Sequence, residues 1–307
     1  MTEWAGHARR VLDQGQACAL ISLLAVEGSA PREAGTRMVV TTDACLGTIG
    51  GGHLEFLAVK QARAALDHPP GAWRIQDYPL GPLLGQCCGG RVRVMVERLD
   101  PVYSGWLREA EIRPAFALET RLYDDHVERH LVAETPATLT AKGPQPAAGD
   151  RLVEAVGVPV TQLTLFGAGH VGQAIARLMP GLPFELRWYD ERPEFSPQTV
   201  PQNLADIAQN ASGLVLIMTH DHALDYRLTA AALSGEASFI GLIGSATKRV
   251  RFLNRLRKDG FGEDTLQRLT CPIGITGIAG KAPEIIAVSV VAQLLLRRAD
   301  GGTDGSA

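Results

Sequence analysis

The chain has 307 residues, of which 46% are hydrophobic and 21% are charged, and its formal net charge is −3. This length is sufficient for two domains that each bury a core, and the composition is typical of a globular protein rather than a disordered one. The small acidic excess argues against nucleic acid as a partner, and no apolar run reaches the roughly 20 residues that a membrane span needs.

The N-terminus lacks the apolar core of a secretion signal, so the cytoplasm is the expected compartment. The cysteines are five in number and show no C-x-x-C spacing, which indicates neither a disulfide framework nor a structural zinc site. Cys87 and Cys88 are neighbours whose Cα atoms lie about 3.8 Å apart, too close for a normal disulfide, so we expect free thiols.

In the N-terminal half, hydrophobic periodicity predicts a mixture of helices and strands. The expected elements are a helix over 7–14, a buried strand over 18–26, a strand over 36–42, a helix over 54–66, a half-exposed strand over 91–98 and a hairpin over 115–132. Residues 135–150, rich in Pro, Ala, Thr and Gly, are typical of a linker. We therefore predict an N-terminal α/β (α+β) domain over 1–134.

From Gln162 onward, strand-like and helix-like segments alternate. Strands are expected at 163–166, 184–189, 214–218 and 239–243, with helices from Val171, from about Ala223, from about Ala246 and over 285–298. This alternation predicts a Rossmann-like doubly wound parallel-sheet domain over 151–300, followed by a disordered tail over 301–307. The apolar character of the last helix favours a homodimer.

A dinucleotide-type glycine fingerprint opens the C-terminal domain. Gly167, Gly169 and Gly172, with His170 between them, follow an apolar strand and begin a helix, and Asp190 closes the next strand. In this arrangement the glycines admit a pyrophosphate and the carboxylate binds ribose hydroxyls. The pattern is a strong signal for the fold and a weaker one for a bound nicotinamide or flavin, because a fold does not fix function.

The candidates for an acid or base of a dehydrogenase are His220, Asp221, His222 and Asp225, which follow the strand over 214–218. The carboxyl ends of strands are where α/β sheets place ligands. Loop histidines also occur for no chemical reason, and both interpretations stay open at this point.

A cluster of basic residues marks the helix that starts after Gly244 and Ser245; its members are Lys248, Arg249, Arg251, Arg255, Arg257 and Lys258. Such a helix could hold a phosphate near Gly244, Ser245 and Lys248 and present its outer face to an acidic partner protein. A simple solvated face is the alternative for the outer arginines.

Cys87 and Cys88 are followed by Gly89 and Gly90. Flanking glycines leave sulfur accessible and let backbone amides converge on an anion, which favours thiolates suited to thiophilic metals or to sulfur transfer. Metal ligation by Cys87 and Cys88 is therefore one hypothesis, and a structural role in a tight turn is the alternative.

A second glycine cluster lies upstream, where Gly50, Gly51 and Gly52 precede a helix and so form an anion-binding geometry. His53 and Glu55 follow directly; they could serve the same site, or act as a turn residue and a helix-dipole partner. Arg32 and Arg37, nearby in sequence, could contact a phosphorylated ligand.

These segments, taken in order, resemble the XdhC/CoxI family of maturation factors for molybdenum hydroxylases. The motifs that carry the resemblance are Gly28-Ser29-Ala30-Pro31-Arg32, Gly35-Thr36-Arg37-Met38, residues 47–55, residues 80–90, residues 166–172, Thr219-His220-Asp221-His222, residues 241–245 with Lys248, Pro272-Ile273-Gly274 and Pro283-Glu284-Ile285. The combination of His53-Leu54-Glu55 with Gln86-Cys87-Cys88-Gly89-Gly90 is similar to the xanthine dehydrogenase branch.

The resemblance implies a chaperone that binds the molybdenum cofactor (Mo-molybdopterin) as cargo, protects it during sulfuration and delivers it to apo xanthine dehydrogenase. The implied partners are that enzyme, a cysteine desulfurase or other sulfur donor, and cofactor-biosynthesis proteins. An NAD(P)-dependent oxidoreductase is the alternative, but it leaves Cys87, Cys88 and residues 50–52 unexplained, so NAD(P) is not the expected ligand. A third hypothesis, an adaptor that docks through the basic helix, is compatible with the first.

Overall fold

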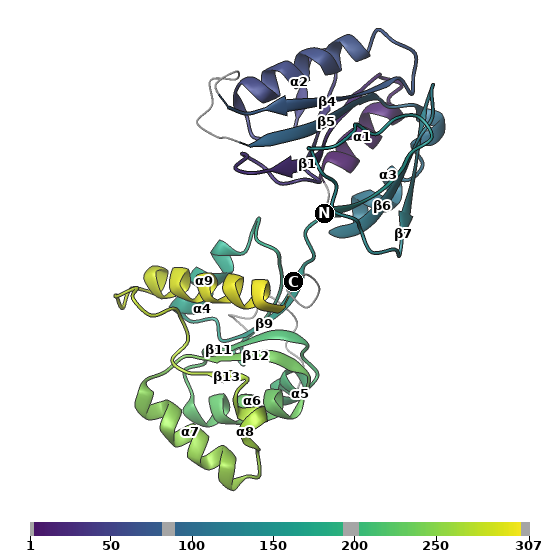
Figure 1. Ribbon diagram of the computed structural model, residues 1–307. Coiled ribbons are helices and arrows are strands. Elements are labelled where there is room, and N and C mark those ends of the chain that lie inside the picture. Colours follow the sequence, from purple (N-terminus) through teal and green to yellow (C-terminus); the bar gives the residue numbers. More distant parts are fainter. Residues whose placement is uncertain (1–2, 82–89, 193–202, 302–307) are drawn as a thin grey trace. The chain divides into compact units, whose positions relative to one another are not determined.

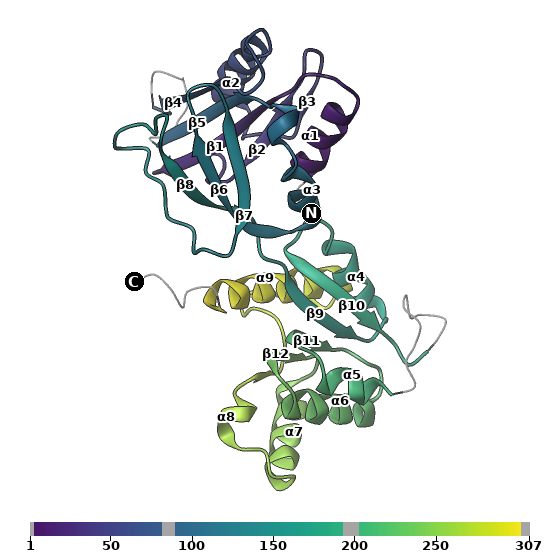
Figure 2. The same ribbon diagram turned by 90° about the vertical axis from the view of Figure 1, so that its right-hand side faces the viewer.

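The computed structural model describes residues 3–81, 90–192 and 203–301. The chain divides into two compact units, Met1–Pro159 and Val160–Ala307, each with its own hydrophobic core. Figure 1 and Figure 2 show the elements of each unit. No helix within the described ranges is long and apolar enough to cross a membrane.

The N-terminal unit contains two antiparallel sheets and three α-helices in its described part. Its elements are α1 (Glu3–Asp13), β1 (Ala19–Glu27), β2 (Arg37–Val40), β3 (Cys45–Leu46), α2 (Gly52–Ala65), β4 (Trp73–Pro79), β5 (Arg91–Arg98), the 3₁₀ helix η2 (Pro101–Tyr103), α3 (Leu107–Ile112), β6 (Ala115–Leu122), β7 (Val127–Val132) and β8 (Arg151–Gly157). The strand orders are β3-β2-β1-β5-β4 and β7-β6-β8.

The larger sheet of this unit is covered on both faces. Its α2 side is filled by Leu54, Ala58 and Ala62. On the other side, Leu122 and Leu152 of the smaller sheet share a cluster with residues of β1, β4 and β5. This double cover explains why β5, expected to be half exposed from its alternating sequence, is buried from Val92 to Glu97.

The C-terminal unit is a five-stranded sheet in which every described strand pair is parallel. Its elements are β9 (Thr161–Phe166), α4 (His170–Leu178), β10 (Phe184–Tyr189), α5 (Leu204–Gln209), β11 (Gly213–Ile217), α6 (His222–Ser234), β12 (Ala237–Leu242), α7 (Ala246–Lys258), α8 (Glu263–Leu266), β13 (Leu269–Thr270) and α9 (Pro283–Gly301). The strand order is β10-β9-β11-β12-β13. Helices α4 and α9 cover one face and α5 to α8 the other, which confirms the predicted doubly wound fold.

The division between the two units lies after Pro159, later than the boundary near residue 150 expected from sequence. The reason is that β8 pairs with β6 along its whole length and so completes the smaller sheet of the N-terminal unit. The expected linker also packs on that unit, because Arg93 donates to the carbonyls of Gly143 and Pro144 at 2.9 and 3.0 Å. The expected tail falls almost wholly outside the described residues.

Candidate functional site

Gly50 and Gly51 precede α2 and Gly52 begins it, and all three have left-handed backbones, with φ of 117°, 73° and 68°. A run of this kind is accessible only to glycine. Glu55 fixes its shape, because one carboxylate oxygen accepts hydrogen bonds from Thr48 Oγ1 at 2.6 Å and from the amides of Ile49 and Gly51 at 2.9 and 3.1 Å. Burial opposes ionisation of Glu55, but these donors outweigh it and lower the pKa of the carboxyl group.

Residues 29–32 lie between this glycine loop and Gly90. A Cβ added to Gly50 would lie 2.5 Å from Pro31 Cβ and 3.3 Å from Arg32 Cγ, so the loop packs directly on these residues. Gly90 lies against Ser29, whose carbonyl oxygen would be 2.3 Å from a Cβ at that glycine. The structure therefore brings together residues that sequence motifs placed about sixty positions apart.

An open hollow of about 440 Å³ adjoins this loop. Its lining residues are Val26, Gly28, Ala30, Pro31, Arg32, Glu33 and Ala34. Arg32 is exposed there, and its positive charge contributes to the lowered pKa of Glu55. The hollow, the cation and the glycine loop together make this the candidate site of the N-terminal unit, which we call the Gly50 site.

Arg37 does not belong to the Gly50 site. Its side chain is fully buried, Nη2 lies 2.5 Å from Glu154 Oε1, and its guanidinium lies 5.2 Å from the ring centroid of Trp4. Sequence proximity to Arg32 was misleading, because Arg37 begins β2 and is directed toward the smaller sheet of the same unit, where β8 supplies Glu154. Arg37 is a core residue instead.

His53 is exposed in the first turn of α2 and stacks on Phe56, with ring centroids 6.1 Å apart. Phe56 is itself 64% exposed. Cys87, Cys88 and Gly89 lie outside the described residues. Within the ranges that the structure describes, no group of three or more His, Cys, Asp or Glu side chains is arranged to hold a metal ion.

The other residues that the sequence predicted for a binding site belong to the C-terminal unit. They lie just after the carboxyl ends of the parallel strands β9, β10, β11 and β12, at one edge of the sheet. The chain order reverses between β9 and β11, which is where open α/β sheets bind ligands. The loops there are tightly packed, because a Cβ on Gly167 would lie 2.3 Å from the carbonyl oxygen of Met218. A Cβ added to Gly172 would lie 2.2 Å from the carbonyl oxygen of Gly167, so this contact is equally close.

Asp190 is held by groups of its own unit. Its carboxylate accepts from Ala168 N at 2.6 Å and from Arg192 N, Nε and Nη2 at 2.9, 2.8 and 3.0 Å. Burial works against ionisation, but Arg192 and the two amides outweigh it and lower the pKa of Asp190 to about 2. A ribose would have to displace these partners. Gly169 and His170, at the start of α4, are exposed, and no side chain of the described residues caps that helix.

The residues after β11 and β12 form a second internal network. Asp225 is buried and accepts from Thr219 Oγ1 at 2.7 Å, from Thr219 N at 3.1 Å and from Lys248 Nζ at 2.5 Å. Ser245 caps α7 through Lys248 N, and Gly244 packs on the Lys248 side chain. Lys248 and Asp225 therefore join α7 to α6, and this accounts for both without a ligand.

His220 remains accessible after β11. Its side chain is 60% exposed, and Nε2 lies 3.7 Å from Glu191 Oε1, so the loops after β11 and β10 meet at this point. Asp221 caps α6 by accepting from the amides of Ala223 and Leu224. His222 is exposed at the first position of that helix.

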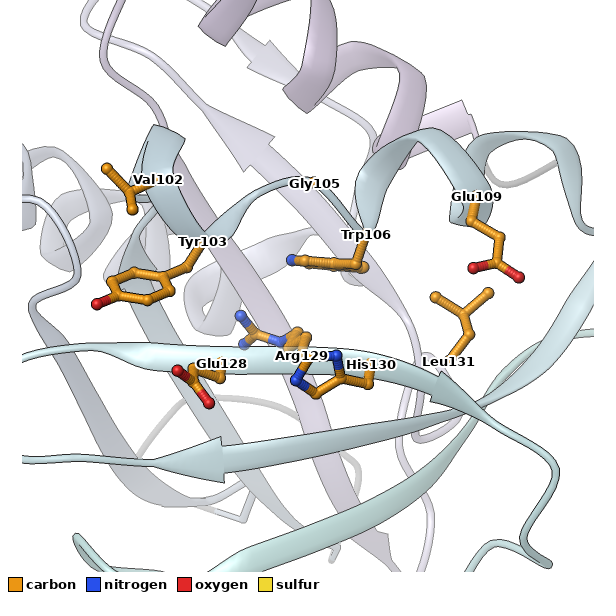
Figure 3. Close-up of a pocket in the computed structure, with 9 residues that line it drawn as sticks. All are labelled: Val102, Tyr103, Gly105, Trp106, Glu109, Glu128, Arg129, His130 and Leu131. Atoms are coloured by element: carbon orange, nitrogen blue, oxygen red, sulfur yellow. The ribbon is translucent and has the colours of Figure 1, made fainter.

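One hollow contains none of the residues singled out from the sequence. It has a volume of about 430 Å³ and is lined by Val102, Tyr103, Gly105, Trp106, Glu109, Glu128, Arg129, His130 and Leu131. Figure 3 shows Trp106 on one side of it and β7 residues on the other. Arg129 lies 5.3 Å from the Trp106 ring and pairs with Glu97. Residues 100–132 carry no recognisable motif, so no signal in the sequence pointed to it.

Comparison with protein families matches both units. Residues 11–78 match the XdhC and CoxI family, and residues 163–294 match the XdhC Rossmann domain. A crystal structure described as that of a xanthine dehydrogenase from Bacillus halodurans has a TM-score of 0.75 at 20% identity, covering 98% of this chain and 97% of that one. At this identity the likeness shows the fold.

Three curated relatives match 94% of this chain each. They are YqeB of Escherichia coli K12 (23% identical), a protein of Bacillus subtilis 168 named as a probable xanthine dehydrogenase component (24%) and the molybdenum cofactor insertion chaperone PaoD of E. coli K12 (23%). The match spans 45% of YqeB, 95% of the B. subtilis protein and 85% of PaoD. Because the two family models match residues 11–78 and 163–294, one in each unit, this protein belongs to the XdhC and CoxI family.

Proposed function

We propose that this protein binds a molybdopterin-type molybdenum cofactor as cargo, protects it while a sulfido ligand is installed and delivers it to an apo enzyme of the xanthine dehydrogenase class. The observation that carries the proposal is the match over 94% of the chain to a relative named as a molybdenum cofactor insertion chaperone. A second relative, the B. subtilis protein named for xanthine dehydrogenase, supports the class of the receiving enzyme.

The Gly50 site has features that suit such a cargo, which combines a phosphate, a flat pterin and a metal dithiolene. Its hollow of about 440 Å³ lies within the usual range for small-ligand sites, roughly 300–1,000 Å³. The backbone at Gly51 is open, because a Cβ there would meet no atom within 4 Å. We assign Arg32 to the anionic group of the cargo, and Glu55 to holding the loop rather than to contact.

The thiols of Cys87 and Cys88 are assigned to the same site. Gly90, two residues after Cys88, lies against Ser29 at the edge of the Gly50 site. Thiolates bind thiophilic metals and take part in sulfur transfer, so they suit a cargo whose metal receives sulfur. The sulfur itself would come from a donor protein such as a cysteine desulfurase.

The alternative, an NAD(P)-dependent oxidoreductase, receives less support. The Asp190 oxygens that would bind ribose hydroxyls are already paired with Ala168 and Arg192. Asp225, one of the candidate acids or bases, is already paired with Lys248. His220 and His222 are accessible candidates that remain from that hypothesis.

The test is anaerobic purification from cells that make the cofactor, followed by quantification of molybdenum and of the oxidised pterin fluorophore. We expect the wild-type protein to carry both molybdenum and the pterin, and Arg32→Ala to carry at least tenfold less of each. Arg63→Ala is the matched control, because Arg63 is an exposed arginine of α2 in the same unit. The same measurement on Cys87→Ala and Cys88→Ala tests the thiols, with lower retention or transfer expected. A wild-type protein that neither carries the cofactor nor activates the apo enzyme would refute the proposal.

A further inference from the structure

Helix α7 concentrates positive charge in a chain that is acidic overall. Its thirteen residues include Lys248, Arg249, Arg251, Arg255, Arg257 and Lys258 and no acidic residue, whereas the whole chain carries a net charge of −3. Like charges on adjacent helical turns repel one another, so the stability of the isolated helix does not explain this composition. Lys248, Arg255 and Arg257 have partners within the C-terminal unit, whereas Arg249, Arg251 and Lys258 form no salt bridge with the described residues.

The inner face of α7 is fixed to its own unit. Phe252 and Leu256 are buried in the core that α7 shares with α5, α6 and α8. At the first turn, Lys248 Nζ donates to Asp225 Oδ2 at 2.5 Å and to the carbonyl of Ile243 at 2.9 Å. The helix is therefore a rigid support for whatever lies on its outer face.

Two further cations are engaged near the C-terminal end. Arg257 forms a bidentate pair with Glu263, at 2.6 and 3.1 Å. The Arg255 guanidinium lies 3.8 Å from the ring centroid of Tyr226, whose hydroxyl donates to Asp259 at 2.6 Å. Both side chains thus have partners within the C-terminal unit.

The outer face of α7, defined here as Val250, Arg251, Asn254 and Lys258, is exposed along its length. Arg251 and Lys258 are seven residues apart, so they lie on one side of the helix, about 10 Å apart along its axis. Neither forms a salt bridge among residues 3–81, 90–192 and 203–301. Val250 lies beside them with 56% of its surface exposed.

The helix dipole accounts for only part of this face. A cation in the last turn, such as Lys258, is favoured by the partial negative charge at the helix C-terminus. Arg251 lies in the middle of the helix, where that effect has vanished. Arg251 thus lies in the middle of the helix beside an exposed valine and forms no salt bridge with the described residues. Protein interfaces combine charged and apolar side chains in this way, each meeting a complementary group of the partner.

We infer that the outer face of α7 docks an acidic surface of a protein partner, and that this partner is the apo enzyme that receives the cofactor. The identity of the partner rests on the proposed function. A protein is favoured over nucleic acid, because nucleic acid selects a basic excess over a whole domain and this chain has a net negative charge. A protein is favoured over an anionic membrane, because the apolar residues Phe252 and Leu256 of α7 are buried in the core and cannot insert into lipid. The exposed apolar residue Val250, at the N-terminal end of the face, also suits a protein surface.

The test measures how fast purified apo enzyme of the xanthine dehydrogenase class binds to two cofactor-loaded proteins, the wild type and the double variant Arg251→Glu/Lys258→Glu. The measurement is repeated at salt concentrations from about 50 to about 500 mM. Because rim charges act mainly on association, we expect the association rate of the double variant to fall at least tenfold at low salt and to lose most of its salt dependence. Val250→Ala should raise the dissociation rate several-fold. Arg63→Glu/Arg108→Glu is the matched control, since both arginines are exposed residues of the N-terminal unit; we expect it to bind as the wild type does.

Cargo content, measured on the same preparations, separates the two proposals. A double variant that keeps its cofactor and loses the apo enzyme supports docking through α7. The docking surface would be overturned if the double variant associated with the apo enzyme as fast as the wild type, or if the control lost as much association as the double variant. It would also be overturned if loaded wild-type protein did not bind the apo enzyme. Each of these outcomes leaves the cargo proposal intact. Tighter α7-dependent binding to duplex DNA or to phosphatidylserine vesicles than to the apo enzyme would also overturn the docking surface. A wild-type protein without cargo would refute the proposed function instead.

Discussion

Two buried ion pairs join the sheets of the N-terminal unit. Arg37 of β2 pairs with Glu154 of β8 at 2.5 Å, and Arg129 of β7 pairs with Glu97 of β5 at 2.6 Å, with all four side chains at most 5% exposed. Burial lowers the pKa of Arg37 and raises that of Glu97, because both charged forms lose hydration. The pairs offset that cost, so each partner depends on the other.

Removing one partner should therefore be costly. We expect Arg37→Met to lower the free energy of unfolding by about 3–5 kcal/mol, because Glu154 would remain buried and unpaired. Urea unfolding of the N-terminal unit measures this loss. Arg37→Met/Glu154→Leu should recover most of it, since no charge is then left alone.

The control is Arg121→Met, because Arg121 is half exposed and its partner Glu119 also pairs with Arg151. We expect a much smaller loss of stability there. Equal losses for Arg37→Met and Arg121→Met would contradict the role assigned to the buried pair.

The sequence could not have predicted the role of Arg37. Its partner Glu154 lies in a segment that was assigned to the other domain, and nothing in the local pattern indicates that β8 pairs with β6. By contrast, the motif that contains Ser29, Pro31 and Arg32 was recognised from the sequence, and in the structure its residues pack against Gly50 and Gly90 of the two glycine motifs. Glycine motifs are predictable because they reflect local backbone needs, whereas ion pairs reflect long-range contacts.

At the level of elements, the start of α4 shows two glycines with different roles. Gly172 is buried, and a Cβ there would lie 2.2 Å from the carbonyl oxygen of Gly167, so α4 packs directly on the end of β9. Gly169 has a φ of −68°, and a Cβ there would meet no atom within 4 Å. The same motif thus contains a packing glycine and a glycine that faces open space.

This difference predicts opposite outcomes for the same substitution. Gly172→Ala should lower the free energy of unfolding of the C-terminal unit by about 1–3 kcal/mol, because the backbone contact must open to admit the methyl group. Gly169→Ala should leave stability almost unchanged, and urea unfolding of both variants measures the contrast. If Gly169→Ala were as destabilising as Gly172→Ala, the packing explanation would be wrong.

The elements themselves were predictable where the pattern was long. The strand over 91–98, the hairpin over 115–132 and the strand over 184–189 match β5, β6 with β7, and β10. The seven-residue strands β4 and β8 were not predicted, although they are as long as strands that were. The two-residue strands β3 and β13 and the short helices α3, α5 and α8 were not predicted either. Such short pieces have too few residues to show periodicity, and neighbouring elements hold them in place.

At the scale of the whole molecule, the division of the chain after Pro159 makes a prediction about folding. Each unit has a core of its own, so a fragment of residues 1–159 contains both sheets of the N-terminal unit. The fragment 1–134, which ends where the sequence suggested a linker, lacks β8 and with it Leu152, Val156 and Glu154. The two fragments differ in length by only 25 residues, yet only the longer one has the complete core.

We expect fragment 1–159 to unfold cooperatively with heat, and fragment 1–134 to show no cooperative transition. Without β8, the β6 edge is unpaired and Arg37 is buried without its carboxylate, which together outweigh the marginal stability of a small domain. Thermal unfolding followed by circular dichroism measures both fragments, and fragment 160–307 should fold as the complementary unit. A cooperative transition in fragment 1–134 at the temperature of fragment 1–159 would show that β8 is dispensable and that the boundary expected from sequence is the better one.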